Sequence, residues 1–295
     1  MRLAGGIVVA LGVAAPLAGR GLAVAAGIAL VLALLATALP DHYGRPHWDR
    51  PWVGPGWAEL QISRVRMITL LPLVSVYAHA FAVYVVPGHP KIASAGLILV
   101  AVALNNSAYW ISPALRMVVV SLLIVGAVTL VGAGLSARPG LVPAGEQWSA
   151  GEQKPWWAVF LAALALLPLL VPRPGELRWG KFLLSALLGA ALGVAAVRLL
   201  GTDLSITYLK DLLVAADGAF LGTVLVVFVG IATVTATVDV VADAALEFLD
   251  WEDTAAILAT IAFTVFAPPA VLLVTAGIAT SAWAAFRFYI EYLAR

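Results

Sequence analysis

The main pattern along this 295-residue chain is a series of long apolar runs separated by short polar segments. The runs 22–39, 67–86 and 158–171 contain no Asp, Glu, Lys or Arg. A bilayer core about 30 Å thick needs about 20 helical residues to cross it. Strands could cross only as a closed barrel, and the short alternating segments typical of a barrel are not seen. The pattern therefore predicts an all-α fold, a polytopic bundle of transmembrane helices.

Gly, Pro and charged residues divide the apolar runs into about ten spans. Nine spans are the alternative. Pro268 and Pro269 could mark a turn between two helices, which gives ten spans, or a kink within one long helix, which gives nine. The first run has one basic residue but no convincing small-residue cleavage site, so we interpret it as a span rather than a signal peptide. The expected spans are 3–18, 22–39, 67–86, 92–110, 115–135, 156–171, 181–200, 212–234, 254–267 and 270–290.

Two longer polar segments interrupt the spans. Segment 41–66 is rich in Trp, Tyr, Pro and Gly, so we expect it to lie along the membrane surface before a short polar helix at 59–66. Segment 136–155 repeats the tetrapeptide Ala-Gly-Glu-Gln and is expected to be a solvated linker. It divides the chain into membrane halves 1–135 and 156–295 of about five spans each, an organisation used by many transporters.

Composition agrees with a lipid environment, because 63% of the residues are hydrophobic and 11% are charged, against about 45–50% and about 25% in soluble domains. With the N-terminus inside, 11 of the 17 Lys and Arg residues fall on the cytoplasmic side, which favours both termini in the cytoplasm. The net charge of +1 gives no indication of a nucleic-acid partner. The expected partners are the lipid bilayer and partner membrane subunits or further copies of the chain.

Several chemistries are excluded or disfavoured by missing residues. The chain has no Cys, which rules out disulfides, thiolate metal sites, iron–sulfur clusters and a catalytic Cys. It also lacks a Gly-Lys-Ser/Thr phosphate loop, a Gly-x-Ser-x-Gly elbow and a His-Glu-x-x-His motif. We therefore expect no cofactor, and the missing motifs argue against an enzyme without deciding the question. Energy for any transport must come from gradients or from a separate subunit.

Acidic residues concentrate late in the chain, where eight of the sixteen fall between Asp211 and Asp253 without an intervening Lys or Arg. If the eighth span continues as a helix, four of them share one face of it. We expect this face to meet water while the opposite face, with Val238 and Val241, packs against apolar surroundings. The alternative is that stacked carboxylates bind a transported cation, since hard cations prefer oxygen ligands. The four residues of the acidic face are Asp239, Asp243, Glu247 and Asp250.

Asp217 is the first candidate for a substrate or ion site, since it lies five residues into the expected span 212–234. Ionisable groups at membrane depth are costly and usually face the protein interior or water. The alternative is that the helix begins one turn later and leaves Asp217 in the headgroup layer.

Three further residues are weaker candidates. His79 is the one His expected inside a span and could relay protons, because its reference pKa is about 6.5. A single His argues against haem held by two axial His ligands. Asn105 and Asn106, near the end of the fourth span, could bind a substrate or simply cap helices.

The polar loop that contains Asp41, His42, His47 and Asp49 has residues able to bind a transition metal, but their spacing matches no metal motif. We expect a solvated loop there, and the identity of any metal stays unknown. Small residues recur every four positions and predict close helix packing. They are Ser185, Gly189 and Gly193, then Gly218 and Gly222, then Gly277, Ser281 and Ala285.

These features favour a small-solute or cation permease. The alternative is a non-catalytic membrane subunit or scaffold, favoured by the scarcity of polar residues within the spans. A second alternative is an intramembrane enzyme, which would need carboxylates from two helices in one pocket.

Overall fold

The computed structural model describes residues 2–38, 55–106, 113–136, 153–171, 179–201, 204–244 and 251–294. Within these ranges the chain forms eleven α-helices and one 3-10 turn, and the sole strand-like contact is an isolated bridge between Gly19 and Gln153. The prediction of an all-α fold is confirmed for the described residues.

The helices are labelled in chain order. The first five are α1 (Arg2–Ala18), α2 (Leu22–Ala38), α3 (Pro55–Val85), α4 (Pro90–Asn106) and α5 (Pro113–Ser136). The later elements are α7 (Trp156–Leu170), α8 (Trp179–Leu200), α9 (Tyr208–Ala215), the 3-10 turn η2 (Ala219–Leu221), α10 (Gly222–Ala244), α11 (Trp251–Phe266) and α12 (Pro269–Ala294).

Nine of the ten expected spans coincide with single helices. The polar helix expected at 59–66 is continuous with the span that follows it, since both belong to α3. Pro268 and Pro269 mark a turn, because α11 ends at Phe266 and α12 begins at Pro269. Pro suits the first position of a helix, where an N–H would have no partner. The exception is the expected span 212–234, which divides into α9, η2 and α10.

Three helical segments are long and apolar enough to cross a membrane, namely Met67–Val85, Ala219–Ala244 and Pro269–Phe286. Seven other apolar helical segments among the described residues are shorter, at 10 to 17 residues. A membrane protein is therefore supported. The number of crossings and the side on which each terminus lies stay predictions.

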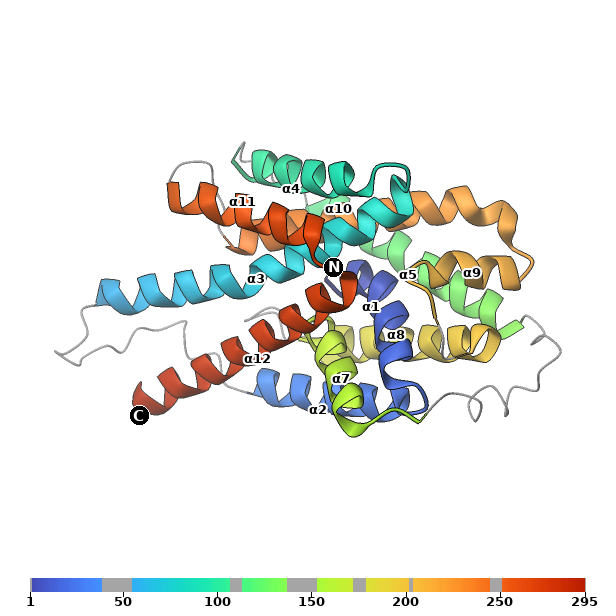
Figure 1. Ribbon diagram of the computed structural model, residues 1–295, viewed down its shortest axis with the longest axis horizontal. Helices are drawn as coiled ribbons and strands as arrows, with labels where there is room; N and C mark the ends of the chain where they lie inside the picture. Colours follow the sequence, from blue (N-terminus) through green and yellow to red (C-terminus); the bar gives the residue numbers. More distant parts are fainter. Residues whose placement is uncertain are drawn as a thin grey trace.

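Helices α3 and α10 form the centre of the molecule and run antiparallel, side by side (Figure 1). Helices α4 and α11 lie on one side of this pair in Figure 1, and α2 and α7 lie on the other. Helix α10 also packs against α1, while α12 packs against α3 and α7. Both expected halves of the chain thus contribute to one core, and the two-half organisation stays a prediction.

Glycines allow the closest helix contacts. A Cβ atom on Gly277 of α12 would lie 2.6 Å from the carbonyl carbon of Leu164 in α7, so only Gly fits there. Gly193 of α8 is different, because a Cβ atom there would make an ordinary contact of 3.5 Å with the side chain of Leu11. The predicted stripe of Gly218 and Gly222 is wrong, because the helix is broken between them and Gly222 faces open space.

Candidate functional site

Buried polar side chains gather in one part of the fold. Among the described residues, every buried Ser, Thr or Asp side chain lies on α3, α4, α10 or α11. We call this set of side chains the polar core. Helix α3 packs against the other three of these helices, and α4 packs against α10 and α11. The members of the polar core are Thr69, Ser75, Ser94, Thr233, Thr237, Asp239, Thr260 and Thr264.

Asp239 is the one charged residue of the polar core, with 7% of its surface exposed. A Cβ atom on Gly230 of α10 would lie 3.5 Å from the Val85 side chain of α3. Since each helical residue advances about 1.5 Å, Asp239 lies about 14 Å further along α10. Because the two helices are antiparallel, this is the level of Ser75 and Tyr77 on α3, which are both fully buried. The carboxylate therefore lies within the bundle.

The threonines of the polar core bind their own helices. The hydroxyls of Thr233 and Thr237 donate to the carbonyls of Val229 and Thr233, each at 2.7 Å. Thr260 and Thr264 of α11 donate in the same way to the carbonyls four residues earlier, at 2.7 and 2.6 Å. A hydroxyl that donates a hydrogen bond still has lone pairs on its oxygen, and these can accept a second hydrogen bond or bind a cation. These hydroxyls are therefore oxygen acceptors within an otherwise apolar interior.

The expected acidic face is only partly described. Asp239 is buried, so the expectation that this face meets water is wrong at that residue, whereas Asp243 is half-buried and does not contradict it. The physical reason is that α10 packs against α1, α3 and α4, and neighbouring helices cover the side that carries Asp239. Glu247 and Asp250 lie outside the described residues.

Asp217 does not lie within a helix. It occupies an exposed turn after α9 with a φ of 57°, and the positive φ identifies it as the left-handed residue that ends that helix. Its N–H donates to the Val214 carbonyl at 3.1 Å, and the N–H of Gly218 donates to the Leu213 carbonyl at 2.7 Å. These two bonds form a Schellman motif, in which Asp is tolerated because its short side chain permits a left-handed backbone. The long helix α10 therefore begins at Gly222, ten residues after the start of the expected span at 212. A ligand role for Asp217 stays a prediction.

Replacing Asp217 with Gly is expected to leave the fold intact and to stabilise it by up to about 1 kcal/mol, because Gly adopts a positive φ without a steric cost. Thermal unfolding of the purified protein would measure this. A lower midpoint for Asp217→Gly would show instead that the carboxylate makes a contact that stabilises the turn.

The remaining candidates lie at the edges of the polar core. His79 is half-buried on α3, the helix that contributes Ser75 to the polar core. Asn105 is half-buried and Asn106 is exposed at the end of α4. The structure thus places His79 on the same helix pair as Asp239, while Asn105 and Asn106 lie where helix capping is expected.

A tyrosine that sequence reasoning left without a role makes the most distinctive long-range contacts. The Tyr84 hydroxyl, at the end of α3, donates to the carbonyl of Ile206 at 3.0 Å and accepts the N–H of Leu209 at 3.4 Å. Tyr208 beside it is fully buried, and this burial raises the pKa of its hydroxyl well above the ordinary value. The sequence signal for this contact is a Tyr near the end of an apolar span. Such a Tyr is expected to be largely buried, and a buried hydroxyl usually finds a hydrogen-bond partner.

Among the described residues no three His, Asp or Glu side chains lie together in an arrangement that could hold a metal ion. The metal candidates Asp41, His42, His47 and Asp49 lie outside the described residues.

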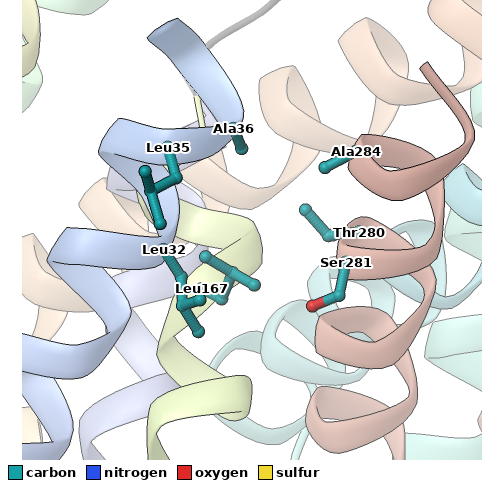
Figure 2. A pocket seen from close by; sticks show the side chains of 7 residues that line it. All are labelled: Leu32, Leu35, Ala36, Leu167, Thr280, Ser281 and Ala284. Atoms are coloured by element: carbon teal, nitrogen blue, oxygen red, sulfur yellow. The ribbon is translucent and has the colours of Figure 1, made fainter. Parts of the chain in front are cut away.

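A separate groove of about 310 Å³ opens between α2, α7 and α12 (Figure 2). Thr280 and Ser281 of α12 line it, but the hydroxyl of each donates to a carbonyl of its own helix, at 2.8 and 2.9 Å. The groove is therefore apolar in character, and none of its helices contributes to the polar core. Its lining residues are Leu32, Leu35, Ala36, Leu167, Thr280, Ser281 and Ala284.

No protein-family model matches the chain, and no curated protein matches it. We therefore infer the function from the geometry of the chain itself.

Proposed function

We propose that this chain is a multi-pass membrane permease for a small solute or a cation, with Asp239 at its binding site. The observation that supports this most directly is the burial of one carboxylate, 7% exposed, on the most apolar of the three helices long enough to cross a membrane. A buried charge in an apolar helix costs several kcal/mol, and such residues usually serve ion or proton pathways.

The surroundings of Asp239 suit a small cation or a proton. On α10 itself, Thr233 and Thr237 lie about 120° and 160° around the helix from Asp239, so the proposed oxygen ligands come from α3, α4 and α11, which carry the other buried hydroxyls. A carboxylate among neutral oxygen ligands matches the preference of hard cations.

Flux into sealed proteoliposomes tests the proposal. We expect the purified protein to carry Na⁺, protons or a divalent cation down an imposed gradient, at a rate well above that of protein-free vesicles. Protein heated past its unfolding transition before reconstitution serves as the control. Folded protein that moves none of these ions, alone or with a panel of small solutes, would contradict the proposal.

A non-catalytic membrane subunit is the second candidate, and the groove between α2, α7 and α12 is the observation that favours it. Leu35 on its rim is 62% exposed, so an apolar partner could cover it. Size-exclusion chromatography with light scattering, on protein from its native membrane, would distinguish the two. Stable co-purification of other chains without any flux favours the subunit.

A further inference from the structure

Helix α9 is separated from its neighbours at both ends by left-handed residues. Gly201, with a φ of +79°, follows α8, and Asp217, with a φ of 57°, follows α9. Such residues end helices and change the direction of the chain. Two left-handed residues thus flank the eight residues of α9, one after α8 and one directly after α9.

Residues 204–216, which we call the plug, lie toward one end of the molecule in Figure 1 and have a buried side as well as an exposed one. Leu204, Tyr208, Leu209, Leu212 and Leu213 are all at most 4% exposed. The plug packs against α8, α5, α1 and α10. Irregular backbone within a membrane protein is tolerated where it is buried in protein or lines a water-filled cavity.

The Tyr84 hydroxyl is a cap for α9 that comes from another helix. The first N–H groups of any helix lack partners within it. Thr207, at the capping position of α9, makes no capping bond with its side chain. Tyr84 supplies the missing acceptor to the N–H of Leu209, and it also donates to the Ile206 carbonyl just before the helix. One hydroxyl thus links α3 to both sides of the start of α9.

Helix α1 closes the opposite side of this junction. The backbone of Gly12 lies directly against the carbonyl oxygen of Ser205, and a Cβ atom there would also lie 3.0 Å from the Cα atom of Ile206. Within the plug, the Ser205 hydroxyl donates to the Asp211 carboxylate. The plug is thus held by one hydroxyl of α3, by a tight backbone contact with α1, and by its own polar bonds.

We propose that residues 204–216 form a hinged plug, held closed by the Tyr84 hydroxyl, whose outward movement admits water and solute to the interior of the bundle. The consequence for transport depends on the proposed function, but the movement itself does not. The plug has two ends that can pivot and one side-chain latch, whereas α8 and α10 are continuous helices.

The test is Tyr84→Phe, which keeps the ring and removes the hydroxyl. Leaving a buried N–H and carbonyl unsatisfied costs about 1–2 kcal/mol, so hydrogen exchange of the amides at 204–216 should quicken about five- to thirty-fold. Ser281→Ala is the matched control, because it also removes a hydroxyl bonded to a backbone carbonyl, at 2.9 Å, but on α12. We expect Ser281→Ala to leave exchange in the plug unchanged.

Thiol labelling gives a second readout, because the chain contains no Cys. A Cys introduced as Leu213→Cys, at a position 3% exposed, should react faster with a water-soluble maleimide in the Tyr84→Phe background than with Tyr84 present. If Tyr84→Phe changes neither hydrogen exchange at 204–216 nor maleimide labelling of the introduced Cys, the proposal of a hinged plug is overturned. Faster exchange and labelling without any ion flux would support the plug and count against the permease.

Discussion

Replacing Asp239 with Asn is expected to lower cation or proton flux in proteoliposomes at least about tenfold, which corresponds to a loss of about 1.4 kcal/mol in binding. Asn keeps the size of the side chain and one oxygen but loses the charge that attracts a cation and the group that accepts a proton. Since Asp239 is the one charged residue in the polar core, no other described side chain there can replace it.

Two matched variants make this result specific. Asp217→Asn changes an exposed carboxylate in a turn, and Asp243→Asn changes a half-buried one four residues from Asp239 on α10. We expect Asp217→Asn to transport as the unmodified protein does, and Asp243→Asn to fall between the two. Loss of flux in Asp217→Asn with normal flux in Asp239→Asn would move the binding site to the turn after α9.

The second large effect concerns Gly277, where even Ala is expected to destabilise the protein by about 3 kcal/mol or more. The added Cβ would lie 2.6 Å from the carbonyl carbon and 3.1 Å from the Cα of Leu164, and backbone cannot rotate away as a side chain can. Helices α7 and α12 would have to separate, which would disturb the packing of α12 on α3. Thermal unfolding in detergent, followed by Trp fluorescence, measures the loss.

Gly27→Ala is the control, because Gly27 lies within α2 and a Cβ there meets nothing within 4 Å. That change should stabilise the protein by about 0.5–1 kcal/mol, since Ala forms helix better than Gly. Equal effects of the two substitutions would mean that the contact between Gly277 and Leu164 is not present in solution.

The positions of the helices could be predicted because long apolar runs and Pro or Gly boundaries act locally. The break after Ala215 could not be predicted, since Asp217 and Gly218 stand between apolar residues and hydropathy alone continues the span through them. The left-handed turn depends on two backbone hydrogen bonds, to Leu213 and Val214, that only the folded chain displays. Hydropathy therefore places Asp217 within a span, whereas the structure places it in an exposed turn after α9.

The burial of Asp239 was harder to predict for a related reason. Helical periodicity groups it with Asp243 on one face, but periodicity does not say which neighbouring helices cover that face. Helix α3, more than 130 residues earlier in the sequence, packs beside it. A carboxylate expected at the surface is thus enclosed by contacts that no local pattern contains.

The pairing of α3 with α10 also bears on how the protein is made. Translation proceeds at about 5–20 residues per second, so about 7–28 s separate the synthesis of Val85 from that of Gly222. During this interval α3 has left the ribosome without its main partner. The Ser75 hydroxyl is bonded to the Leu71 carbonyl of its own helix, but His79 must be hydrated, or be sheltered by the insertion machinery or by α4, until α10 arrives. Biogenesis of this chain therefore includes a waiting period in which the eventual centre of the molecule is still open.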